Sequence, residues 1–228
     1  MIRVNPRKTN ESIYFPDGGY CFLKNEYFSV AIPVIDTRVK VKRGHIHLDV
    51  GSIILSYKGV PFLVDPGTYT YTRDLNQRKK YISDKTHNVL SVRNEEFGYT
   101  RVPGFFGVEV DNRMNITQKS DTSISFNHVY YGEQIEISVS IEGETVFIRG
   151  YGGNKLESFL HLDPEVKITE VSGRKTVLKN GKYRAEIAAS VPLTGENYEF
   201  SPGYGIRQKA ERIVYRGNNM LDLQFTFT

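Results

Sequence analysis

The sequence predicts an all-β protein, a large antiparallel β-sandwich of the supersandwich type with very little helix. Apolar residues recur at every second position in several stretches, most clearly in 135–141 and 221–227. This period of two is typical of strands with one buried face. Turn signals such as Asn180-Gly181 and Pro202-Gly203 separate these stretches, and no long helical period is present. Many short strands joined by turns favour a sandwich of antiparallel sheets.

The elements can be assigned in chain order. Residues 1–18 are expected to be an irregular lead-in that ends in a Pro-Asp-Gly-Gly turn, and residues 34–41 a bridge rich in β-branched residues. The one helix expected is about two turns long, near residues 74–81. Strands are expected over or around residues 20–24, 27–33, 61–64, 89–92, 124–126, 135–141, 145–150, 166–168, 183–187 and 221–227.

Size and composition limit the number of domains and the classes of binding partner that can be expected. The chain has 228 residues, a formal net charge of +4 and no polybasic block, so one domain over residues 1–228 and no nucleic-acid partner are expected. Its single cysteine, Cys21, excludes a disulfide framework and is expected to be a small core residue. No apolar run has the length of a membrane helix, so no membrane partner is expected.

The residues that carry chemistry are concentrated between Gly44 and Asn88. Three of the five histidines of the chain lie there. If residues 45–49 form a strand, His45, His47 and Asp49 project from one face at spacings of about 7 Å. Two imidazoles and a carboxylate on one face can begin a metal site, because zinc takes histidine nitrogen and carboxylate oxygen ligands.

Two further residues of this stretch are candidates. Asp65 ends an expected strand and is followed by Pro66-Gly67, which holds its carboxylate at the end of a sheet. Such an aspartate can equally cap its own turn. His87 precedes the next expected strand, where a structural histidine is the alternative. The remaining histidines, His128 and His161, are weaker candidates that could line a cleft.

The loop over residues 72–85 is rich in basic side chains, and Arg78 is one of them. Arginine can hold a uronate carboxylate through two parallel hydrogen bonds. Tyr69 and Tyr71 precede this loop and could stack on sugar faces. The alternative is a solvated loop with aromatic side chains packed beneath it.

These motifs together resemble one known family. Gly44-His45-x-His47-x-Asp49, residues 61–72 (Pro-Phe-Leu-Val-Asp-Pro-Gly-Thr-Tyr-x-Tyr-Thr) and His87-Asn88 resemble the C-terminal domain of heparinase II/III-like polysaccharide lyases. The opening run 15–20 and the later runs 159–162 and 201–205 resemble the same domain more weakly. The likeness covers nearly the whole chain.

The resemblance implies a β-sandwich that works with an N-terminal helical toroid and cleaves uronic-acid-containing glycans by β-elimination. It implies zinc held by His47, Asp65 and His87, with His45 as the catalytic acid/base. Tyr69, Tyr71, Arg78 and Asn88 are then expected to contact an acidic polysaccharide. It also implies a periplasmic or secreted protein, although no export signal is visible in residues 1–16.

Two departures from the family pattern bear on activity. No helical repeat precedes the sandwich, so the chain is expected to be incomplete on its own and to need the helical toroid upstream or in trans. Ile82 stands where family members often carry an arginine. The main alternative is therefore a non-catalytic, metal-stabilised carbohydrate-binding or structural domain. A cupin-like metalloenzyme is disfavoured because the later Glu and His of that pattern are missing.

Overall fold

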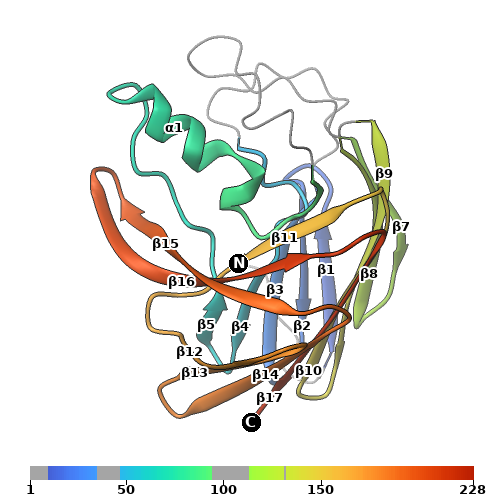
Figure 1. Cartoon of the computed structure of the whole chain (residues 1–228). Helices are drawn as coiled ribbons and strands as arrows, with labels where there is room; N and C mark the ends of the chain where they lie inside the picture. Colours follow the sequence, from blue (N-terminus) through green and yellow to red (C-terminus); the bar gives the residue numbers. More distant parts are fainter. Residues whose placement is uncertain (1–9, 35–46, 94–112, 131) are drawn as a thin grey trace, which may run out of the picture.

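The computed structural model describes residues 10–34, 47–93, 113–130 and 132–228, and these residues fold into three antiparallel sheets (Figure 1). The all-β prediction is confirmed. Apart from one short α-helix and one turn of 3₁₀ helix, every regular element of the described part is a strand.

The first sheet has five strands in sequential order, each paired with the next. They are β1 (Glu11–Phe15), β2 (Tyr20–Lys24), β3 (Phe28–Pro33), β4 (Ile54–Tyr57) and β5 (Val60–Leu63). This sheet is a simple meander, and its last strand delivers the chain to Asp65.

The second sheet has eight strands in the order β12-β13-β14-β17-β10-β9-β8-β7. Their bounds are β7 (Arg113–Lys119), β8 (Ser123–Tyr130), β9 (Glu133–Glu142), β10 (Thr145–Gly152), β12 (Lys167–Ser172), β13 (Lys175–Asn180), β14 (Tyr183–Ala189) and β17 (Met220–Phe227). The third sheet has the order β15-β16-β11-β6. It consists of β6 (Leu90–Val92), β11 (Leu156–His161), β15 (Leu193–Gly203) and β16 (Ile206–Arg216).

One hydrophobic core joins the three sheets. The alternating apolar residues of β9 and β17 are buried, as the period of two predicts. Phe227 of the second sheet packs against Phe28, Tyr57 and Phe62 of the first, with ring centroids 5.1, 4.6 and 4.8 Å away. Cys21 is fully buried within the same core, as expected. Aromatic pairs at these distances add to the stabilisation from area burial.

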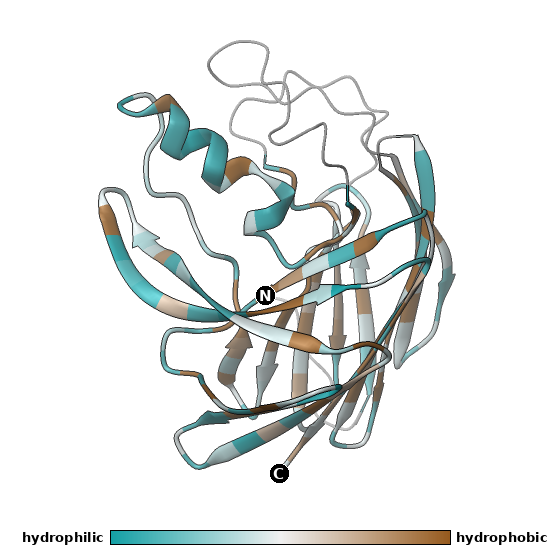
Figure 2. Cartoon of the chain, viewed as in Figure 1, coloured by the Kyte–Doolittle hydropathy of each residue, from teal (hydrophilic) through white to brown (hydrophobic). Residues whose placement is uncertain are grey.

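The short helix α1 (Leu75–Ile82) lies close to the hairpin of β15 and β16, and most of its ribbon is hydrophilic (Figures 1 and 2). Asp74 caps its N-terminus by accepting hydrogen bonds from the backbone N–H groups of Asn76 and Gln77, both at 3.0 Å. The buried Tyr81 donates a hydrogen bond of 3.2 Å to the carbonyl of Glu199 in β15. The helix is thereby tied to the third sheet.

Two sequence expectations are wrong in the described part. Residues 11–15 form the edge strand β1 instead of an irregular lead-in, paired with β2 from Glu11–Lys24 to Phe15–Tyr20. Residues 47–49 are not a strand. Leu48 instead donates to the carbonyl of Ile82, and Ser52 donates to the carbonyl of Asp49 in a turn. The expected bridge over residues 35–41 lies outside the described residues.

Candidate functional site

Asp65 is held at the end of β5 by its own turn and by the third sheet. Its Oδ1 accepts a 2.8 Å hydrogen bond from the backbone N–H of Gly67. Gly67 has a φ of 80° and pairs with Ser201 of β15, and a Cβ at this position would overlap the Ser201 carbonyl oxygen. Only glycine fits both the left-handed backbone and this close approach. The turn-capping alternative for Asp65 therefore holds, but it occupies only one carboxylate oxygen.

His87 is placed by η1 (Asp84–Thr86), the 3₁₀ turn that follows α1. Ser83 begins this turn by accepting a hydrogen bond from Lys85, and the His87 N–H ends it by donating to the carbonyl of Asp84 at 3.0 Å. The imidazole of His87 is completely buried. The backbone of the turn therefore positions His87 without the help of a ligand.

The second oxygen of Asp65 bonds His87. The distance between Asp65 Oδ2 and His87 Nδ1 is 2.7 Å, and 22 positions of sequence separate the two residues. Burial alone would raise the pKa of Asp65, but the hydrogen bond and positive charge of His87 outweigh it and lower that pKa. Burial would lower the pKa of His87, but Asp65, joined by the charges of Asp49 and Asp84, raises it. The two residues form an electrostatically coupled pair.

His47 lies beside this pair. Its ring centroid is 5.2 Å from that of His87, with the rings tilted by 42°. Its Nε2 is 3.3 Å from Thr68 Oγ1, in the loop that follows Asp65. Asp49 is near enough to interact with both His87 and Asp65, and burial raises its pKa. The structure thus brings together the three residues expected to bind metal, with Asp49 close by.

The chemistry of this set suits a divalent metal, although the arrangement is not that of a formed metal site. Two imidazoles and one carboxylate are a common protein ligand set for zinc. The buried Nε2 of His87 has no hydrogen-bond partner among the described residues, so it is free to accept a ligand. Asp65 and His87 bond each other directly, however, and within the described ranges no three His, Cys, Asp or Glu side chains are grouped as metal ligands.

Asn88 has no group left for a substrate. Its buried amide donates to the carbonyls of Ile53 and Val64, at 2.8 and 3.0 Å. Its Oδ1 accepts from the backbone N–H of His161 at 2.7 Å and lies 3.1 Å from the Nδ1 of the same residue. All four hydrogen-bonding positions of the amide are therefore used internally. The expectation that Asn88 contacts the substrate directly is therefore wrong, and Asn88 instead connects the segments that carry Asp65, His87 and His161.

A second group of predicted residues gathers between α1 and the tip of the β15–β16 hairpin. The ring of Tyr71 stacks with that of Tyr204, with centroids 6.1 Å apart and planes at 12°. Both rings are exposed, Tyr71 by 37% and Tyr204 by 57%. Tyr69 is half-buried and has the guanidinium carbon of Arg207 4.3 Å from its ring centroid. Tyr71 and Tyr204 therefore present an aromatic surface to solvent.

Arg78 lies beneath Tyr71, with its guanidinium carbon 5.2 Å from the ring centroid. The side chain is only 3% exposed. Its Nε and one terminal nitrogen have no hydrogen-bond partner among the described residues. A buried guanidinium with unused donors is costly unless an acceptor reaches it. A ligand carboxylate or sulfate is such an acceptor.

The other candidates lie elsewhere. His45 is outside the described residues. His128 is fully buried in β8, opposite Met114 and Ile135.

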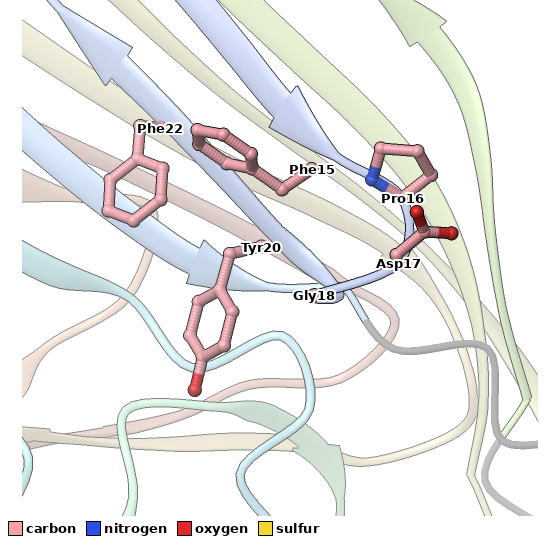
Figure 3. A pocket seen from close by; sticks show the side chains of 6 residues that line it. All are labelled: Phe15, Pro16, Asp17, Gly18, Tyr20 and Phe22. Carbon is pink, nitrogen blue, oxygen red and sulfur yellow. The ribbon is translucent and has the colours of Figure 1, made fainter. Parts of the chain in front are cut away.

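An apolar depression of about 320 Å³ lies at the turn between β1 and β2 (Figure 3). Its side chains include Phe15, Tyr20 and Phe22, and its lining contains none of the residues predicted to be functional.

Comparison with known families decides the classification. The family model described as "Heparinase II/III-like, C-terminal" matches residues 7–224 of this chain. The chain belongs to this family. A comparison with curated protein sequences gives no significant match.

Solved structures agree with the heparinase II/III-like fold. The heparan sulfate lyase HepC from Pedobacter heparinus has a TM-score of 0.75 and 13% identity, over 99% of this chain and 37% of that one. A heparinase III, the BT4657 gene product, has a TM-score of 0.74 and 11% identity, and the match covers 96% of this chain and 36% of that one. A putative aldose 1-epimerase from Escherichia coli K12 has a TM-score of 0.51 and 9% identity, over 96% and 99%. This heparinase II/III-like chain spans little more than a third of the lyases' length, and likeness at this identity establishes the fold alone.

Sequence reasoning missed the partners that come from β15 and β16. Tyr204 lies in a Pro-Gly-Tyr-Gly run, which gave a turn signal and a weak family likeness but no role for the tyrosine itself. Its stacking on Tyr71 is accompanied by a backbone hydrogen bond from Gly205 to the carbonyl of Tyr69, at 2.8 Å. No local pattern reveals a pairing between segments about 135 positions apart. Within the described residues, no helix combines the length and apolarity needed to cross a bilayer.

Proposed function

We propose that this chain is the β-sandwich part of a polysaccharide lyase that cleaves uronic-acid-containing glycans by β-elimination. The observation that carries the proposal is the convergence of His47, Asp65 and His87, with an exposed tyrosine pair and a buried arginine on the neighbouring loop. Family membership supports it, and the similar structures include a heparan sulfate lyase.

We further propose that His47, Asp65 and His87 hold one zinc ion. The buried, unpartnered Nε2 of His87 and the nearby His47 ring support this assignment. Zinc bound there would supply positive charge and fix the orientation of the residues around it. Binding would also stabilise the fold, because metal affinity is linked to folding.

The reaction assigns separate tasks to this chain's own residues. β-Elimination removes the proton next to the uronate carboxylate and expels the glycosidic oxygen on the neighbouring carbon. His45 is proposed as the acid/base, since imidazole has a pKa near neutral. Arg78 is proposed to bind the uronate carboxylate and so to stabilise the negative charge that develops beside it. Tyr69 and Tyr71 are proposed to hold sugar rings over the site.

The chain spans 37% of the length of the lyase HepC, so we propose that activity requires a helical-toroid domain in the same polypeptide or in trans. The exposed stack of Tyr71 and Tyr204 supports a second candidate, a carbohydrate-binding domain without catalysis. In either case an acidic polysaccharide is the partner. Action in the periplasm or outside the cell is part of the lyase proposal.

The test follows the unsaturated uronate product by its ultraviolet absorbance. The chain is incubated with heparan sulfate alone and together with a helical-toroid domain from a heparan sulfate lyase. We expect product only in the mixture, and we expect His45→Ala to abolish it while zinc content is unchanged. Binding of the glycan without product in the mixture, for every uronate polymer tried, would support the binding domain and overturn the lyase.

A further inference from the structure

A depression that contains His161, the residue bonded to Asn88 Oδ1, has no role in the account above. It has a volume of about 420 Å³ and is lined by residues of α1, η1, β11, β15 and β16. Its lining includes Lys80, His161, Glu199, Lys209 and Arg212. The volume is within the range of about 300 to 1,000 Å³ found for small-ligand sites. Figure 1 shows α1 and the β15–β16 hairpin at the same end of the molecule.

His161 is the buried residue of this depression, and its orientation is fixed. Asn88 Oδ1 is an acceptor, because the amide nitrogen of Asn88 already donates to two carbonyls. His161 Nδ1 must therefore carry the hydrogen in the 3.1 Å contact with that oxygen. The ring also packs against Tyr198, with centroids 4.7 Å apart and planes at 79°. Tyr198 is itself held by a 2.6 Å hydrogen bond to the carbonyl of Leu162.

The remaining nitrogen of His161 is a buried acceptor to which no described residue donates. In a neutral ring protonated at Nδ1, Nε2 carries a lone pair. The side chain is 0% exposed, and Nε2 has no hydrogen-bond partner among the described residues. Burial, assisted by the charge of Arg212, keeps the pKa of His161 well below its usual value, so the ring stays neutral. A ligand hydroxyl satisfies this lone pair, whereas a fully deprotonated anion has no hydrogen to offer.

The charged side chains around His161 differ in how fully they are paired. Arg212 donates twice to Glu196, at 3.2 and 2.7 Å, and Lys80 donates to Glu199 at 2.8 Å. Lys209 stands opposite Glu199 in the β15–β16 register and makes no ion pair within the described residues. The depression therefore has one cation that is not committed to a particular carboxylate. The exposed ends of Lys80 and Lys209 can move to admit a ligand to the ring beneath them.

We propose that this depression is a subsite for a hydroxyl-bearing acidic saccharide unit, with a sugar hydroxyl donating to His161 Nε2 and the carboxylate bound by Lys209. It rests on the proposed function, because it assigns a second stretch of the same acidic glycan to this chain. His161 and Lys209 are binding residues in this account and take no part in bond cleavage.

The test is a titration of the folded chain with glucuronate, glucose and inorganic sulfate, followed by NMR signals of the His161 ring and the Lys209 side chain. We expect glucuronate to shift both sets of signals and to bind about tenfold more tightly than glucose. Lys209→Ala should reduce the affinity for glucuronate to that for glucose. The matched variant Lys179→Ala, which changes an exposed lysine on β13, should leave it unchanged.

Three outcomes would overturn the subsite. They are shifts by sulfate equal to those by glucuronate, shifts at Arg78 and Tyr71 without any at His161, and no shift at millimolar saccharide. His161→Phe keeps an aromatic ring against Tyr198 and should lower the affinity for glucose and the affinity for glucuronate by the same factor. The readout is independent of product formation and zinc content. The lyase proposal can therefore fail while the subsite stands, and the reverse holds as well.

Discussion

Asp65 Oδ2 and His87 Nδ1 lie 2.7 Å apart, joining the end of the first sheet to the turn after α1. The bond holds together two segments that have no strand pairing with each other. The Asp65 side chain is also fixed by the N–H of Gly67, and the His87 imidazole is enclosed by its complete burial. The candidate site is therefore pre-organised by the fold, as binding sites require.

The first prediction concerns Gly67. Gly67→Ala should cost several kcal/mol, because it combines a positive φ with overlap on the Ser201 carbonyl. Gly205→Ala is the matched variant, since Gly205 has a φ of 75° and open space where its Cβ would lie. It should cost only about 1 to 2 kcal/mol. Urea denaturation measures both, and equal losses would show that the contact between Gly67 and Ser201 is unimportant.

The second prediction concerns Asn88. Asn88→Ala leaves the carbonyls of Ile53 and Val64 and the N–H of His161 without partners inside the protein. Buried unpaired groups cost about 1 to 3 kcal/mol each, with partial relief by relaxation or water, so a loss of about 3 kcal/mol is expected. Asn219→Ala, at an exposed position, should change stability by less than about 0.5 kcal/mol. A loss below about 1 kcal/mol for Asn88→Ala would contradict its role as a connector of segments.

Much of the secondary structure could be predicted from the sequence. The strand patterns of β9 and β17 were predictable because one buried face imposes a period of two. The helix was predictable from its charged loop and from Asp74, an N-capping residue type. The edge strand β1 was missed because its residues are mixed polar and aromatic and only half-buried, so no clear alternation marks it.

The site was predicted in part, and the reasons are physical. His47, Asp65 and His87 do come together, but residues 47–49 are held by a turn and by the carbonyl of Ile82 instead of a strand ladder. Asn88 was expected to bind substrate, yet its amide is used by Ile53, Val64 and His161. Contacts between segments so far apart in the chain leave no local pattern in the sequence. The chemical role of an individual residue could therefore be proposed from the sequence, whereas its hydrogen-bond partners could not be predicted.

The third prediction concerns acid stability and His128. Burial lowers the pKa of His128 to about 4, from 6.5 in the unfolded chain. Between pH 6.5 and 4 the unfolded state binds a proton that the folded state does not, so stability falls on acidification. From pH 7 to pH 5 this histidine should account for a loss of about 2 kcal/mol. His128→Leu should lose correspondingly less over that interval in urea denaturation, and an unchanged pH dependence would contradict a buried neutral ring.

The fourth prediction concerns Arg78. Arg78→Ala should weaken binding of a uronate polymer by about tenfold or more, because it removes buried donors that have no hydrogen-bond partner among the described residues and that suit a carboxylate. Arg73→Ala changes an exposed arginine of the same loop and should lower the affinity by less than about threefold. Affinity electrophoresis in heparan sulfate compares them, with circular dichroism to verify folding. Equal effects of the two variants would mean that only general positive charge matters.

The zinc content of the purified chain tests the central claim most directly. After dialysis against metal-free buffer, elemental analysis should find about one zinc per chain, as a set of two histidines and one aspartate implies. His47→Ala should lose the metal, whereas His128→Leu, which changes a histidine of β8 outside the proposed ligand set, should retain it. A chain that is metal-free at full stability, or a His47→Ala variant that keeps its zinc, would contradict the assignment of His47, Asp65 and His87.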